Sequence, residues 1–234
     1  MNEILTLTWK EYRNNIHLLV FAISVLALPI IWATSITLLN ARPEATYADM
    51  LAAGMMFGSV GSIIFSQFVM LCLGGHLIAG ERGGRTFEFL FLQPVSRRTI
   101  ALSKLLFAFV WSVATWLLVG FIAFCGYMLT NQDNGPAFDF VNSSFFVEVA
   151  VVGLLLFATS WFASSMLNNS VVSMCAGAFA STCVFIFLLL VVRDRFEPTF
   201  SFYEYDWTRI LIMFPISVTA IVAGLVRFIK RKSP

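Results

Sequence analysis

The sequence predicts an all-α, polytopic membrane protein. We expect six transmembrane helices, an interfacial helix before the first span, and a short cytoplasmic helix between spans two and three. The first reason is composition: 59% of the 234 residues are hydrophobic and only 12% are charged, whereas soluble domains carry roughly 25% charged residues. The second reason is that six stretches each contain the roughly 20 apolar residues that a membrane-spanning helix needs.

The six spans are expected to form a single transmembrane domain over residues 1–234. Spans two and three contain 30 residues each, or about 45 Å of helix, which exceeds a hydrocarbon core of roughly 30 Å. We therefore expect both either to tilt or to project beyond the bilayer, and we favour projection beside the segment 81–99 that joins them. The spans are expected at about 17–39, 51–80, 100–129, 145–166, 171–192 and 210–228.

Residues 1–16 are expected to form the interfacial helix. Leu5, Trp9, Tyr12 and Ile16 recur at the spacing of one helical face, and charged side chains occupy much of the remainder. Such a helix lies in the plane of the membrane interface with its apolar face toward the lipid. A frayed tail before the first span is the alternative interpretation.

Basic residues are divided unequally between the two sides of the predicted membrane protein. Eleven of the 15 Lys and Arg residues, but only four of the 13 Asp and Glu residues, fall on the side that holds both termini. That side carries a net charge of +7 and the opposite side −5. Because cytoplasmic loops are enriched in Lys and Arg, both termini are expected in the cytoplasm, with the chain in the plasma (inner) membrane.

The middle of each predicted span lacks Asp, Glu, Lys and Arg. Lys104 is expected near the inner end of span three, where its ammonium group can snorkel to the interface. Charges inside a bilayer usually mark proton relays and ion paths, so a proton-coupled pump and a charged channel are disfavoured. The sequence also lacks GxxxxGK[ST], HExxH and GxSxG motifs. We therefore expect no enzyme activity and no cofactor in this chain.

Two further classes of partner are disfavoured by composition. A net charge of +2 provides no basic field for nucleic acid, so no nucleic-acid partner is expected. The nine Met and four Cys residues would suit a copper path, because soft metals prefer sulfur ligands. These residues are also ordinary packing residues of apolar helices, and we expect no metal site.

Span two contains two features of interest. Gly54 and Gly58 form a GxxxG motif, which allows close packing of helices. The motif suits packing within the chain, and a dimer contact is the alternative. Gln67 is the most polar side chain near the middle of a span. It is a candidate for the substrate path, and a hydrogen bond to a neighbouring helix is the alternative role.

The segment from Glu81 to Lys104 carries the strongest functional pattern. Phe87, Leu90 and Phe91 share one helical face. Pro94 is expected to end this short helix, and Ser96 or Thr99 is placed to cap the next one. A cytoplasmic helix with exposed apolar side chains suits docking of a soluble partner. The alternative is a helix lying flat on the inner leaflet, with its arginines against anionic lipid.

This segment resembles the cytoplasmic stretch of ABC-2 type transporter permeases. In that family a Glu-Arg pair ends span two, a Gly-Thr-x-Glu-x-Leu run and a Pro-Val-Ser-Arg turn follow, and the next helix has a Lys near its start. One departure is that Arg85 stands where the family usually has Gly. The matching positions are Glu81, Arg82, Thr86, Glu88, Leu90, Pro94, Val95, Ser96, Arg97, Ser103 and Lys104.

The resemblance implies a permease that pairs with a second permease subunit in the lipid membrane and with cytosolic ABC ATPase subunits, which hold ATP and Mg²⁺. It usually implies export. The chain also resembles haem-exporter-type six-span subunits, which have a similar size and a comparable inner segment. Coupling to the ATPase partner is implied for Glu81, Arg82, Thr86, Glu88, Leu90, Phe91, Pro94 and Arg97.

The last outer loop is rich in aromatic residues. By resemblance, it is a candidate outer gate, and an aromatic belt at the membrane interface is the alternative. The candidate gate residues are Phe200, Phe202, Tyr203 and Trp207.

Three functions are thus considered from the sequence. The first is the transmembrane permease subunit of an ATP-driven exporter. The second is an energy-independent membrane channel or assembly scaffold. The third is a membrane-embedded enzyme, which is disfavoured because the chain offers no reactive constellation.

Overall fold

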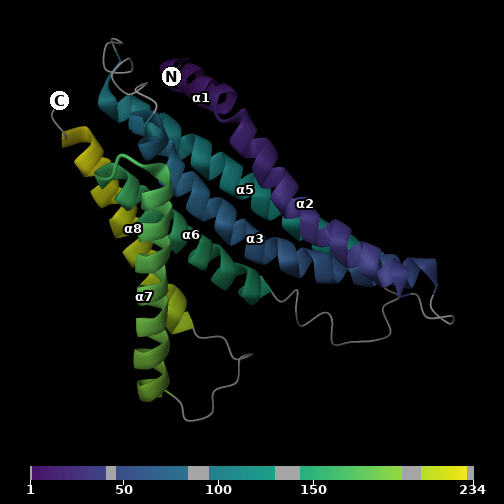
Figure 1. The fold of residues 1–234 in the computed structure, drawn as a ribbon. Helices are drawn as coiled ribbons and strands as arrows, with labels where there is room; N and C mark the ends of the chain where they lie inside the picture. The colour runs from purple at the N-terminus through teal and green to yellow at the C-terminus, as the bar shows by residue number, and fades with distance from the viewer. Residues whose placement is uncertain (1, 41–45, 84–94, 130–142, 197–206, 231–234) are drawn as a thin grey trace. The chain divides into compact units, whose positions relative to one another are not determined.

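The fold is all-helical in the part of the chain that can be described. The structure is a computed structural model and describes residues 2–40, 46–83, 95–129, 143–196 and 207–230. In these ranges there are seven helices and no strand, which confirms the predicted fold class (Figure 1). The helices are α1 (Asn2–Asn14), α2 (Ile16–Leu39), α3 (Tyr47–Gly83), α5 (Arg97–Leu129), α6 (Ser143–Met166), α7 (Ser170–Phe196) and α8 (Trp207–Lys230).

Six of the described helices are long and apolar enough to cross a membrane. They are α2, α3, α5, α6, α7 and α8, and each coincides with one predicted span. As expected, α3 and α5 are the longest, with 37 and 33 residues. At 1.5 Å per residue, α3 extends over about 55 Å. The chain is therefore a multi-pass membrane protein by the length and composition of its helices.

Helix α5 begins where the sequence predicts. Ser96 precedes it, and the backbone N–H of Thr99 donates to Ser96 Oγ at 3.1 Å. A serine hydroxyl in this position satisfies one of the N–H groups that have no partner within the helix. Ser96 is therefore the cap, and the Thr99 hydroxyl lies 2.7 Å from it.

The described helices contribute to two compact units, which are considered separately. The first unit comprises Met1–Glu11, Met70–Ala108 and Ala150–Pro234. The second unit comprises Tyr12–Val69 and Phe109–Val149. Helix α3 therefore contributes its N-terminal part to the second unit and its C-terminal part to the first.

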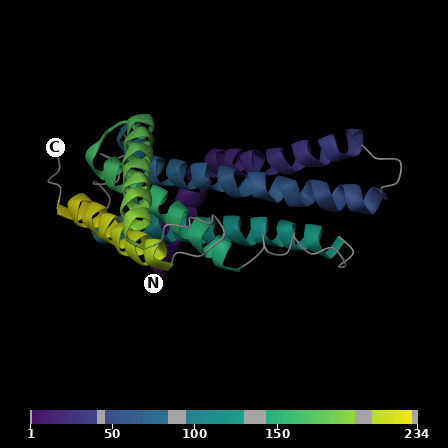
Figure 2. The same cartoon turned by 90° about the horizontal axis from the view of Figure 1, so that it is seen from below.

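The second unit is held together by close packing of α2 on α3. A Cβ atom on Gly58 would lie 2.5 Å from the Cα of Ile30, and one on Gly54 would lie 2.6 Å from the Cα of Thr34. The GxxxG motif is thus used inside the chain, where only glycine lets the two backbones approach so closely. Figure 2 shows α2 and α3 running side by side.

A small apolar core lies beside this seam of the second unit. Leu26 of α2, Ile63 of α3 and Val119 of α5 are buried together, and Val149 of α6 packs against them. The Ser62 hydroxyl donates to the Leu26 carbonyl oxygen at 2.7 Å, so a hydrogen bond joins the two helices within the apolar surroundings.

The core of the first unit is formed by three helices. Val151 and Leu155 of α6, Leu188 of α7, and Ile210 and Met213 of α8 are buried against one another. Helices α6 and α7 are also joined by polar contacts, because the Thr159 and Ser181 hydroxyls lie 2.7 Å apart.

Candidate functional site

The predicted coupling residues lie at and between the end of α3 and the start of α5. Glu81 and Arg82 are in the last turn of α3, where only the Glu81 side chain is described, and Arg97 is the first residue of α5. The remaining coupling candidates lie outside the described residues. These are Thr86, Glu88, Leu90, Phe91 and Pro94.

Glu81 is paired with a lysine from the helix on the other side of the coupling segment. Its Oε1 lies 2.8 Å from Lys104 Nζ. The Lys104 side chain is 0% exposed and that of Glu81 is 18% exposed. This ion pair joins the last turn of α3 to the third turn of α5, and these two helices bracket residues 84–94.

A second carboxylate reaches the same ammonium group. Glu11 of α1 lies with Oε1 at 2.9 Å from Lys104 Nζ, and its side chain is 7% exposed. Glu11, Glu81 and Lys104 therefore form one buried ion cluster that joins three helix segments, all within the first unit. We refer to these three residues as the ion cluster.

The position of Lys104 corrects the expectation that it snorkels. Its side chain is fully buried and ends between two carboxylates instead of extending to the interface. Burying an ammonium group is expensive unless it is paired and hydrogen-bonded. Glu11 and Glu81 supply that compensation from two other helices.

Helix α1 supplies Glu11 to the ion cluster and also carries exposed aromatic side chains. Trp9 is 67% exposed and Tyr12 is also exposed, as is Ile16 at the start of α2. The amphipathic N-terminal helix is confirmed as a helix over Asn2–Asn14. Exposed aromatic side chains beside a buried carboxylate suit a helix that lies in a membrane interface.

Three polar atoms of the second unit are buried without a hydrogen-bond partner among the described residues. They are Gln67 Oε1, Trp111 Nε1 and Thr115 Oγ1. Thr115 is one turn before Val119, and Gln67 is one turn after Ile63, while Val119 and Ile63 share a core. Unpaired buried polar groups cost about 1–3 kcal/mol each, so their retention needs an explanation.

The amide nitrogen of Gln67 does have partners. Nε2 donates to the Val149 carbonyl oxygen of α6 at 3.3 Å and to Ser66 Oγ at 3.4 Å. Gln67 thus makes the interhelical hydrogen bond that was the alternative to a substrate role. Its place in a substrate path stays a prediction. The Oε1 atom has no hydrogen-bond partner among the described residues.

The remaining candidates from the sequence are the outer gate residues and the residues that could bind a metal. Trp207 is the first residue of α8, and the other gate candidates Phe200, Phe202 and Tyr203 lie outside the described residues. Across the described ranges, no three His, Cys, Asp or Glu residues gather closely enough to hold a metal ion. The four cysteines are free thiols.

A comparison with protein families identifies the class of this chain. The model of the ABC-2 family transporter protein matches residues 5–196. The chain therefore belongs to the ABC-2 transporter family and is a transmembrane permease of the ABC type. Permeases of this family generally work with a cytosolic ATPase subunit. A search of curated proteins found no match.

Sequence reasoning missed the ion cluster as a unit. The sequence predicts Glu81 as a coupling residue and Lys104 as a position of the family motif, but it assigns no role to Glu11. The available signal was the placement of Glu11 among the charged residues of an amphipathic N-terminal helix. Nothing local pairs it with a lysine 93 residues further on.

Proposed function

We propose that this chain is the transmembrane permease subunit of an ATP-driven exporter. It pairs with a second permease subunit and with separate cytosolic ATPase subunits, which hold ATP and Mg²⁺. Membership of the ABC-2 family supports this proposal. The charge asymmetry supports an orientation with both termini, and the segment 84–94, in the cytoplasm of a plasma (inner) membrane.

The observation that carries the proposal is the ion cluster beside the coupling segment. Lys104 holds Glu81, at the end of α3, and Glu11, on α1, within 2.9 Å. A force applied to the segment between Glu81 and Arg97 is then passed to α1, α3 and α5 together. Without this link, the segment would move the end of one helix and leave the other in place.

The contact with the ATPase is assigned to the segment itself. Thr86, Glu88, Leu90 and Phe91 supply polar and apolar side chains, and Pro94 ends the segment before Arg97 and α5. In this proposal the segment receives the movement of the ATPase, and the ion cluster keeps its two ends in a fixed relation.

The test is co-purification of the tagged permease with its ATPase subunit after the double substitution Glu88→Ala and Phe91→Ala. We expect the association to be lost while membrane insertion is unchanged. Phe179→Ala, an exposed aromatic residue on α7, is the matched control and is expected to retain the ATPase. Intact association of the double variant would refute the assignment of the coupling segment. Transport that persists without nucleotide would indicate the channel or scaffold function instead.

We also propose that the substrate path passes Gln67. The unpaired atoms of Gln67, Thr115 and Trp111 support it, because a passing polar group would satisfy them. Gln67→Leu is expected to lower transport while leaving ATPase association unchanged. Equal transport by the variant and the original chain would contradict this path.

A further inference from the structure

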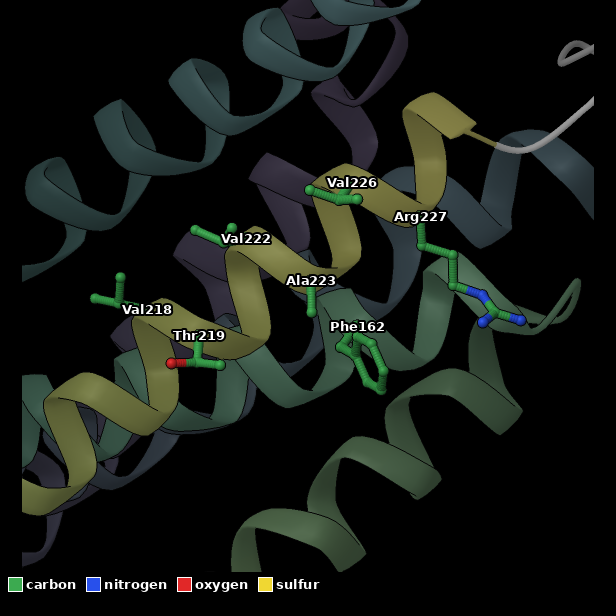
Figure 3. Close-up of a pocket in the computed structure, with 7 residues that line it drawn as sticks. All are labelled: Phe162, Val218, Thr219, Val222, Ala223, Val226 and Arg227. Atoms are coloured by element: carbon green, nitrogen blue, oxygen red, sulfur yellow. The ribbon is translucent and has the colours of Figure 1, made fainter.

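A groove lies on the first unit between α6 and α8. Its volume is about 520 Å³, and it is lined mostly by apolar side chains (Figure 3). The lining residues are Phe162 of α6 and Val218, Thr219, Val222, Ala223, Val226 and Arg227 of α8.

Beside the groove, α6 and α8 approach each other closely at Gly224. A Cβ atom on Gly224 would lie 2.7 Å from Trp161 Cδ1 and 3.4 Å from the Cα of Phe162. The helices meet closely there, and the small Ala223 beside it leaves a hollow in front of Phe162. Val218, Val222 and Val226 are exposed along the same stretch of α8. Their side chains follow one another along the helix in Figure 3.

Arg227 stands at one end of this apolar row (Figure 3). It lies in the last turn of α8, whose other terminal basic residue is Lys230, and the sequence continues with Arg231 and Lys232. Arg227 is exposed and makes no ion pair with any described residue. Basic residues at the cytoplasmic ends of transmembrane helices attract anionic headgroups.

We propose that this groove is a binding site for an anionic phospholipid of the inner leaflet. The phosphate pairs with Arg227, and an acyl chain lies along Val218, Val222 and Val226. The distance from residue 218 to residue 227 is about 14 Å along the helix axis. The groove therefore holds the part of the acyl chain that is nearest the lipid headgroup. A guanidinium group and a phosphate form strong charge-assisted hydrogen bonds.

Charge complementarity favours a lipid over a second copy of the chain. A protein surface that covered this groove would bury Arg227, and an unpaired buried charge is strongly unfavourable. A lipid satisfies both parts of the site at once, because its acyl chain is apolar and its phosphate is anionic. A zwitterionic lipid satisfies the groove equally but carries a compensating ammonium group near the phosphate.

The experiment is native mass spectrometry of the purified, delipidated chain in detergent. It is titrated with dioleoylphosphatidylglycerol, with dioleoylphosphatidylcholine, and with inorganic phosphate. We expect phosphatidylglycerol to bind about tenfold more tightly than phosphatidylcholine, on the scale of one charge-assisted hydrogen bond. Inorganic phosphate alone is expected to show no comparable binding. Equal affinity for the two lipids, or binding of free phosphate at the lipid's affinity, would overturn the proposal.

Two pairs of variants test the two parts of the site. Arg227→Gln is expected to reduce phosphatidylglycerol binding to the phosphatidylcholine level, whereas Arg98→Gln, at an exposed arginine of α5, leaves it unchanged. Ala223→Leu fills the hollow and is expected to weaken phosphatidylglycerol binding, whereas Ala180→Leu, at an exposed position of α7, does not. Arg227→Lys keeps the charge and retains most of the preference.

Two results from the variants would count against the site. Equal losses in Arg227→Gln and Arg98→Gln would indicate general charge attraction. Unchanged binding in Ala223→Leu would remove the groove from the site. The measurement uses neither nucleotide nor transported substrate, so its failure leaves the proposed transport function untouched.

Discussion

The α2–α3 seam of the second unit and the ion cluster of the first unit are two opposite ways to join helices in a membrane protein. The seam uses small residues, and its backbones approach until a Cβ atom on Gly58 would lie 2.5 Å from Ile30 Cα. The ion cluster uses long charged side chains, with Lys104 held by two carboxylates within 2.9 Å. Altering a packing contact lowers the free energy of unfolding moderately. Removing one partner of a buried ion pair lowers it more, because the other charge is left buried and unpaired.

The largest effect is expected at the ion cluster. Lys104→Met keeps the length of the side chain but leaves the carboxylates of Glu11 and Glu81 buried without their cation. We expect the free energy of unfolding in detergent to fall by about 3–5 kcal/mol, measured by thermal or denaturant unfolding. Lys230→Met, at an exposed lysine, is the control and is expected to change little.

A charge reversal sharpens this prediction. The triple variant Glu11→Lys, Glu81→Lys and Lys104→Glu places one carboxylate between two ammonium groups and is expected to recover much of the lost stability. If Lys104→Met is as stable as Lys230→Met, the cluster contributes no more than a surface ion pair, and the contrast with the seam disappears.

The second effect is expected at the seam. Gly58→Ala places a methyl group against the Ile30 backbone and is expected to lower the free energy of unfolding by about 1–3 kcal/mol. Gly120→Ala is the matched control, because nothing lies within 4 Å of its Cβ position. There the alanine is expected to stabilise α5 by up to about 1 kcal/mol. If Gly58→Ala and Gly120→Ala changed the free energy of unfolding in the same direction, close packing would not be what holds α2 on α3.

The smallest effect compares two hydroxyl groups of the second unit. Ser62 donates to Leu26 across the seam, whereas Thr115 Oγ1 has no partner among the described residues. Ser62→Ala is expected to lower the free energy of unfolding by about 0.6 kcal/mol. Thr115→Val, which replaces the hydroxyl with a methyl group of similar size, is expected to raise it by up to about 1 kcal/mol. A loss of stability in Thr115→Val would mean that its hydroxyl is bonded after all.

The sequence predicts the features of this chain whose causes are local. Apolar stretches place the six long helices within a few residues, because a membrane span is defined by its own composition. Ser96 is predicted as a cap because capping involves only the next three residues. The GxxxG motif predicts close packing, but the sequence does not identify α2 as the partner of Gly54 and Gly58.

The ion cluster is the feature that sequence reasoning could not assemble. A lysine near the end of a span can extend to the interface or be buried between carboxylates, and only the arrangement of the helices decides between these states. The same limit applies to Gln67, whose hydrogen bond to Val149 joins residues 82 positions apart. The coupling contacts of Thr86, Glu88, Leu90, Phe91 and Pro94 stay predictions, since they lie outside the described residues.

The separation of Glu11 from Lys104 has a consequence for the biosynthesis of the chain. Glu11 leaves the ribosome 93 residues before its partner, a delay of about 5 to 20 s at ordinary rates of translation. Throughout that time its carboxylate has no ammonium group of Lys104 with which it could be paired on burial. Helix α1 can therefore take its final place only after the third span has entered the membrane, so the first helix to be made is fixed only when half of the spans have been made.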